Sequence, residues 1–170
     1  METGKIMTKE SLQKSCQDGN MSDCFKVGLM KRKGSNKEEA LKYYKKACEG
    51  KYLLACGIFA VLEEKEGHLD LAEKYSRLAC DGGYLISCIL LGNIEIKKGN
   101  KETAKNLYQK ACDGGDVFFG CHKLGHFEEN NGNKVKAKNL FNMACLAGNQ
   151  TSCQELKKLE QSSDNPTTIS

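Results

Sequence analysis

The chain has 170 residues with one proline and no tryptophan, and its 26 basic and 22 acidic residues leave a net charge of +4. The lysines are scattered, as at Lys42, Lys45, Lys74 and Lys105, instead of clustered, so we expect no nucleic-acid partner. Since no apolar run approaches the roughly 20 residues of a membrane span, we also expect no membrane insertion.

Ten cysteines divide the chain at regular intervals. The first members of five pairs are Cys16, Cys48, Cys80, Cys112 and Cys145, and the second members are Cys24, Cys56, Cys88, Cys121 and Cys153. The period is 32 residues, with one step of 33 in each series. A period of this length is typical of a solenoid, in which stacked repeats bury one another's faces and leave an extended binding surface.

Every element predicted along the chain is a helix, which suits a composition rich in Lys, Glu, Ala and Leu. A half-repeat opens the array, four helix pairs follow, and a capping helix precedes a polar tail. The boundaries are 6–19 for the half-repeat, 21–50, 52–82, 84–114 and 116–148 for the repeats, 149–161 for the capping helix and 162–170 for the tail. We expect residues 1–161 to form a single domain.

The second helix of each predicted pair has the apolar spacing of an amphipathic helix. The four stripes are Ala40, Leu41, Tyr44, Ala47 and Cys48; Leu71, Ala72, Tyr75, Ala79 and Cys80; Ala104, Leu107, Tyr108, Ala111 and Cys112; and Ala137, Leu140, Phe141, Ala144 and Cys145. We expect one constant register for all four. Gly50, Gly82 and Gly114 follow their cysteines by two residues and are predicted to end these helices in the left-handed conformation.

Each cysteine pair flanks a turn between two antiparallel helices, which places its sulfur atoms side by side. The predicted disulfides are Cys16–Cys24, Cys48–Cys56, Cys80–Cys88, Cys112–Cys121 and Cys145–Cys153. Buried free thiols that stand in for alanine are one alternative. A metal site is another, although zinc ligands usually lie two to four residues apart. We predict neither a metal nor a cofactor.

The cellular compartment is predicted from two conflicting signals. Regularly paired cysteines favour an oxidising compartment, whereas residues 1–8 lack the apolar core of a signal peptide. We expect a periplasmic or secreted protein whose sequence is a mature form, with the cytoplasm as the alternative.

Several segments resemble Sel1-like repeats, which are relatives of the tetratricopeptide repeat. They are Cys24-Phe25-Lys26-Val27-Gly28, Cys88-Ile89-Leu90-Leu91-Gly92, Cys121-His122-Lys123-Leu124-Gly125 and the segment 39–50. The cysteine placement resembles the Helicobacter cysteine-rich protein family in particular. The resemblance spans about residues 8–160 and implies an all-α fold, a right-handed α/α solenoid with one disulfide per repeat. It also implies two functions, a scaffold for protein complexes or a penicillin-binding protein with weak β-lactamase activity.

The residues themselves favour binding over catalysis. Ser11-Leu12-Gln13-Lys14 and Ser163-Asp164-Asn165 have the pattern of serine β-lactamase motifs, but they lie at opposite ends of the array and no Lys-Thr-Gly accompanies them. We therefore predict no catalytic residue. The alternative is a weak β-lactamase with a β-lactam or peptidoglycan-related ligand.

The first helices are predicted to line a concave groove for a protein or peptide. The predicted contact residues are Phe25, Leu29, Leu54, Val61, Ile86, Ile89, Asn93, Phe119, His122 and His126, with Arg32, Glu64 and Glu129 at the rim. The alternative for any one of them is packing between helices. His122 and His126 lie one helical turn apart, and we interpret them as polar groove contacts because no third metal ligand accompanies them.

Overall fold

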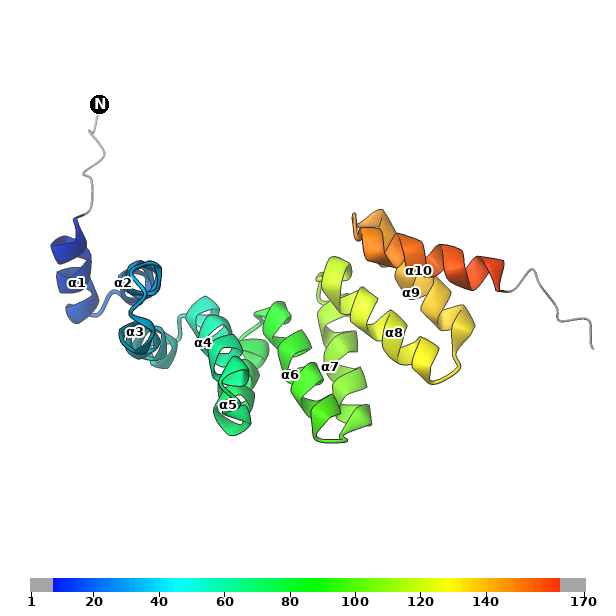
Figure 1. The fold of residues 1–170 in the computed structure, drawn as a ribbon, viewed down its shortest axis with the longest axis horizontal. Helices are drawn as coiled ribbons and strands as arrows, with labels where there is room; N and C mark the ends of the chain where they lie inside the picture. The colour runs from blue at the N-terminus through cyan, green and yellow to red at the C-terminus, as the bar shows by residue number, and fades with distance from the viewer. Residues whose placement is uncertain (1–7, 163–170) are drawn as a thin grey trace, which may run out of the picture. The chain divides into compact units, whose positions relative to one another are not determined.

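The computed structural model describes residues 8–162, so residues 6 and 7 of the predicted half-repeat and residues 163–170 of the predicted tail lie outside it. Within 8–162 it contains ten α-helices, one π-helical turn and no strand (Figure 1). The α-helices are α1 Lys9–Gln17, α2 Met21–Lys33, α3 Lys37–Glu49, α4 Leu53–Lys65, α5 Leu69–Asp81, α6 Leu85–Lys97, α7 Lys101–Asp113, α8 His122–Asn130, α9 Lys134–Leu146 and α10 Gln150–Gln161. The π-helical turn is η1 Val117–Cys121. The all-α prediction is confirmed.

The helices group into two compact units that divide after Tyr84. The first unit contains α1–α5, in which α2 packs on α3 and α4 on α5. The second contains α6–α10, in which α6 packs on α7, and α9 packs on both α8 and α10. The predicted α/α repeat, in which consecutive helices pack as pairs, is therefore present in each unit.

A disulfide lies at each predicted turn. The pairs Cys16–Cys24, Cys48–Cys56, Cys112–Cys121 and Cys145–Cys153 are bonded, with Cα atoms 4.6–4.7 Å apart. Cys80 and Cys88 are also disulfide-bonded, and none of the ten cysteines is free. One disulfide per repeat is thus confirmed, and the alternative of buried free thiols is wrong.

Three of the turns that follow a first cysteine differ from the prediction by one residue. Gly50, Gly82 and Gly114 have φ angles of −81°, −75° and −73°, so none of them is left-handed. The left-handed residue is the next one, Lys51, Gly83 or Gly115. At Gly83, with φ 95°, this conformation lets the Tyr84 N–H donate to the Ala79 carbonyl at 2.9 Å, which closes the end of α5.

The helix pairs pack closely because a glycine faces an aromatic ring. A Cβ atom added to Gly28, Gly92 or Gly125 would lie 2.6, 2.5 or 2.7 Å from the ring of Tyr44, Tyr108 or Phe141. The pair α4–α5 is different, because Ala60 and Ser76 occupy the corresponding positions.

The aromatic residue of α5 is Tyr75, one position earlier than its counterparts. Its ring packs edge-on against Phe59, with ring centroids 4.8 Å apart. The constant register expected for the four stripes is therefore wrong in this pair. Sequence spacing already contains the shift, since Tyr75 precedes its cysteine by five residues and Tyr44 by four.

Among the described residues, no helix combines the length and the apolar character that a membrane span requires.

Candidate functional site

In the first unit, the predicted groove residues differ in exposure. Phe25 is buried at 8% exposure, and its ring packs 5.7 Å from Tyr44 and 5.3 Å from Tyr52. Leu29 and Leu54 are half-buried, and Val61 is exposed. In this unit Val61 therefore offers the most accessible apolar side chain of the predicted set, whereas Phe25 packs between helices.

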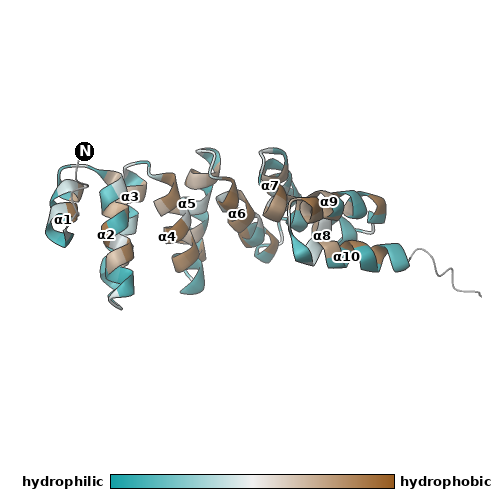
Figure 2. Ribbon diagram, turned by 90° about the horizontal axis from the view of Figure 1, so that it is seen from above, coloured by the Kyte–Doolittle hydropathy of each residue, from teal (hydrophilic) through white to brown (hydrophobic). Residues whose placement is uncertain are grey.

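In the second unit, two predicted contact residues are prominent on the surface. Ile86 and Phe119 are each 50% exposed. Ile89 is buried, and half-buried Asn93 accepts a hydrogen bond from the Tyr108 hydroxyl at 2.9 Å. Helices α4 and α6 carry long runs of hydrophobic residues because they combine a buried face with such exposed positions (Figure 2).

His122 and His126 form a cluster in the second unit. Their rings meet edge to face with centroids 4.6 Å apart, and both pack against the buried ring of Phe141. The His122 Nδ1 lies 2.8 Å from the hydroxyl of Ser152 in α10, and the His126 Nδ1 lies 3.5 Å from Glu129. The two histidines are thus held by neighbouring side chains and present part of their rings to solvent.

The π-helical turn connects this cluster to α10. Asp116 caps the turn by accepting a hydrogen bond from the Phe119 N–H at 3.1 Å. The buried Asn149 donates to the Phe118 carbonyl at 2.7 Å, and its side-chain oxygen also accepts from the Ser152 N–H. The extra residue in this repeat therefore adds a π turn, and Phe119 is exposed in its middle.

Burial shifts the pKa of the His122 imidazole. Burial, reinforced by the charges of His126 and Lys123, lowers the pKa of His122 below 6.5 despite the opposing effect of Glu155. The unfolded chain therefore binds a proton at His122 before the folded chain does, so stability falls as the pH drops below about 6.5.

We expect the His122→Gln variant to lose less stability than the wild type between about pH 7 and about pH 5, the range in which histidine changes charge. Glutamine keeps a polar group beside Ser152 but does not titrate. Urea unfolding across this range measures the difference. The pKa values of Asp23 and Glu128 also lie below their usual range. Protonation of these two carboxyls at lower pH therefore destabilises the variant and the wild type alike. Parallel curves for variant and wild type would contradict the prediction.

A polar contact that recurs in three repeats was not predicted. The side chain seven residues after the second cysteine is a buried glutamate in three repeats, namely Glu63, Glu95 and Glu128. Each binds the residue five positions later, which begins the next helix: His68 at 2.7 Å, Asn100 at 2.7 Å and Asn133 at 2.6 Å. His68 stands at the N-cap position of α5, where its side chain contacts Glu63 and makes no capping hydrogen bond.

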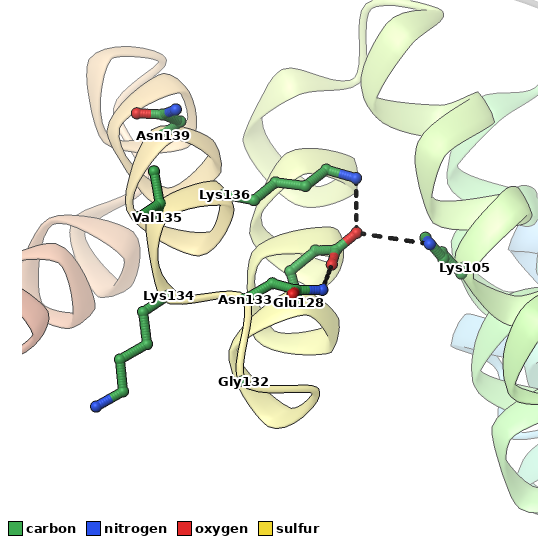
Figure 3. A pocket seen from close by; sticks show the side chains of 8 residues that line it. All are labelled: Lys105, Glu128, Gly132, Asn133, Lys134, Val135, Lys136 and Asn139. Carbon is green, nitrogen blue, oxygen red and sulfur yellow. Dashed lines mark hydrogen bonds and ion pairs between the residues drawn. The ribbon is translucent and has the colours of Figure 1, made fainter.

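An ion pair at this position has its two charges exchanged between the first and the last repeat. Glu128 pairs with Lys136 at 2.6 Å, whereas at the same two positions of the first repeat Lys31 pairs with Glu39 at 2.5 Å. Burial opposes ionisation of Glu128. Hydrogen bonds from Lys136 and Asn133, together with the charges of Lys136 and Lys105, outweigh burial and hold its pKa below the usual range (Figure 3). The repeated Glu spacing in the sequence was the signal for these contacts.

Of the candidate β-lactamase residues, the structure describes those in α1. Ser11 lies in the first turn of α1, where its hydroxyl donates to the Thr8 carbonyl at 2.8 Å, and Lys14 is exposed. Ser163, Asp164 and Asn165 lie outside the described residues. Over residues 8–162, no group of three or more His, Cys, Asp or Glu side chains is placed to hold a metal ion.

Comparisons with known proteins agree with this architecture. The Sel1 repeat model matches residues 13–52 and 120–149, and a tetratricopeptide repeat model matches residues 85–113. A search of curated proteins gives no significant sequence match.

Three solved structures show the same fold at low sequence identity. A protective antigen of uropathogenic Escherichia coli that displays an SLR fold has a TM-score of 0.79 at 20% identity; the match covers 91% of this chain and 36% of the antigen, so the chain spans little more than a third of it. A Sel1 repeat protein from Oxalobacter formigenes has a TM-score of 0.70 at 20% identity, and the match covers 87% of this chain and 70% of that protein. YrrB, a TPR protein with an unusual peptide-binding site, has a TM-score of 0.66 at 15% identity, and the match covers 94% of this chain and 87% of YrrB. The matched segments and the paired helices show that this chain contains Sel1-like repeats, which are related to tetratricopeptide repeats.

Proposed function

We propose that this protein is a repeat scaffold that binds a protein or peptide partner on the first helices of its pairs. The observation that carries the proposal is the exposed Phe119 in the middle of the π turn, which precedes the half-buried histidines of α8. A large apolar anchor next to a few polar groups is the usual composition of a peptide-recognition surface. YrrB, a TPR protein with a peptide-binding site, has the same fold, which supports this reading.

The disulfides support a location outside the cytoplasm. Because disulfides persist in oxidising compartments, we infer that the protein works in the periplasm or outside the cell. The regular cysteine placement is also consistent with the Helicobacter cysteine-rich group. Disulfide links between helices would keep the surface rigid and lower the entropic cost of ordering it on binding.

Selection from a displayed library of random peptides tests the binding face. We expect peptides selected on the disulfide-intact chain to bind the Phe119→Glu variant about tenfold more weakly or worse, as measured by fluorescence anisotropy. Leu71→Glu is the matched control, since Leu71 is an exposed apolar residue on the second helix α5 and lies outside the predicted strip. Peptides that bind the Phe119 variant and the wild type equally would exclude this face.

A further inference from the structure

The outward face of α9 carries a stripe of uncharged side chains. Val135, Asn139, Asn142, Met143 and Leu146 lie at spacings that share one helix face, and all five are exposed. Val135 is 77% exposed and Leu146 is 80% exposed. We call these five residues the outer stripe of α9. Ala137, Leu140, Phe141 and Ala144 form the opposite, buried face.

The same five positions in the other repeats provide an internal comparison. Counted back from the cysteine of each second helix, they are Glu38, Lys42, Lys45, Lys46 and Glu49 in α3; Asp70, Lys74, Arg77, Leu78 and Asp81 in α5; and Glu102, Asn106, Gln109, Lys110 and Asp113 in α7. Five, four and three of these residues are charged, and in the outer stripe of α9 none is. Charge is thus the usual choice at these positions in the other three repeats, and the outer stripe of α9, which has none, indicates a different environment.

Val135 stabilises its helix less than the residues at the same position of the other repeats do. Its counterparts Glu38, Asp70 and Glu102 are acidic residues in the first turn of a helix, where a negative charge is stabilising. Valine lacks this charge, and its branched Cβ is less favourable in a helix. An apolar residue that disfavours its own helix and stays mostly exposed is typical of a functional surface.

The surroundings of the outer stripe are basic. Helix α9 contains Lys134, Lys136 and Lys138 and no acidic residue. Val135 and Asn139 also line an open cavity of about 700 Å³, together with Lys105, Lys134 and Lys136 (Figure 3). Among the described residues that line it, Glu128 is the one carboxylate, and it contacts Lys136 at 2.6 Å and Lys105 at 3.9 Å. Three lysines against one carboxylate leave the cavity with excess positive charge.

We propose that the outer stripe of α9 and its cavity bind a partner peptide segment in which acidic residues stand beside apolar ones. The acidic side chains meet the lysines of the cavity, and the apolar ones cover Val135, Met143 and Leu146. Asn139 and Asn142 offer amide donors and acceptors to the backbone of the segment.

Two other occupants fit these residues less well. A second copy of α9 would bring lysine against lysine, because this helix has no acidic residue to answer them. An anionic membrane surface favours a continuous apolar face, whereas two asparagines interrupt the outer stripe of α9. The acidic segment therefore remains the occupant that the charges and the polar groups favour.

The test compares two displayed peptide libraries of equal apolar content, one with Asp and Glu and the other with Lys and Arg at the remaining positions. We expect enrichment from the acidic library on the disulfide-intact chain. Anisotropy with the selected peptides is expected to show binding that Leu146→Glu and Val135→Glu each weaken about tenfold or more. Added salt should weaken binding further, because the lysine contacts are screened. Circular dichroism verifies that both variants remain folded.

The matched control is Leu78→Glu, since Leu78 occupies in α5 the position of Met143 but lies among charged residues. It should leave binding unchanged. Equal enrichment from both libraries, or unchanged binding by Leu146→Glu, would overturn the proposal. So would binding to vesicles of phosphatidylcholine and phosphatidylglycerol without peptide binding, or a dimer in analytical ultracentrifugation that Leu146→Glu abolishes. Phe119→Glu should not change the affinity for these peptides, so the proposals for the outer stripe of α9 and for the Phe119 face can fail separately.

Discussion

Reduction of the disulfides is expected to unfold this protein under conditions in which the oxidised chain is stable. Each bond closes a loop of eight or nine residues. A loop of this length contributes about 2.5 kcal/mol by restricting the unfolded chain. Five such contributions approach about 12 kcal/mol, which is comparable to the whole stability of a typical domain. The far-ultraviolet circular dichroism of the helices, followed during titration with a thiol reductant, measures the effect.

Variants with a single bond removed separate this explanation from loss of packing. The loops of Cys48–Cys56 and Cys145–Cys153 have the same length, but the first pair is fully buried and the second is half-buried. If the disulfides stabilise the protein mainly by restricting the unfolded chain, replacing either pair by alanine should lower the free energy of unfolding by about the same 2–3 kcal/mol, as measured by urea unfolding. A reduced protein that keeps its helical signal and its urea midpoint would contradict the prediction.

Gly92→Ala is expected to destabilise the second unit by about 1–3 kcal/mol, although alanine favours helix by about 1 kcal/mol over glycine. The new methyl group would lie 2.5 Å from the ring of Tyr108. This ring cannot easily move away, because it is buried and its hydroxyl donates to Asn93 at 2.9 Å. The same burial raises the pKa of Tyr108 to about 12.

The pair α4–α5 supplies the control for this prediction, since it combines Ala60 with Ser76. In a Tyr108→Ser background, Gly92→Ala recreates that combination, and its effect should change sign and become stabilising. Urea unfolding of the two single variants and the double variant gives the coupling energy directly. A Gly92→Ala chain more stable than the wild type would show that the ring yields and would refute the close contact.

Local spacing was sufficient to predict the helices and the disulfides. A cysteine, a short turn and a second cysteine eight or nine residues later bring two sulfur atoms together whatever the rest of the chain does. The period of 32 residues likewise predicted that helix pairs repeat. In three repeats the left-handed position was predicted one residue too early, although the glycine three residues after the first cysteine is the more frequent one, since it occurs in four of the five turns and is replaced by Lys51 in the other.

The candidate site depended on contacts that sequence spacing does not contain. Phe25 and Ile89 have the same helical spacing as exposed groove residues, yet they are buried, because neighbouring helices decide which part of a stripe remains accessible. His122 meets Ser152 from a segment 30 residues later, and Lys105 approaches Glu128 from another helix.

The sequence by itself determined the repeat, the helical class and the cysteine pairs, because each depends on residues a few positions apart. Only the tertiary structure decided which apolar side chains of the predicted groove are exposed and how far Val135 and Leu146 of α9 remain uncovered. The physical reason is that burial and charge pairing arise where separate helices meet. Which residues of a helix are buried there depends on the neighbouring helices that cover it.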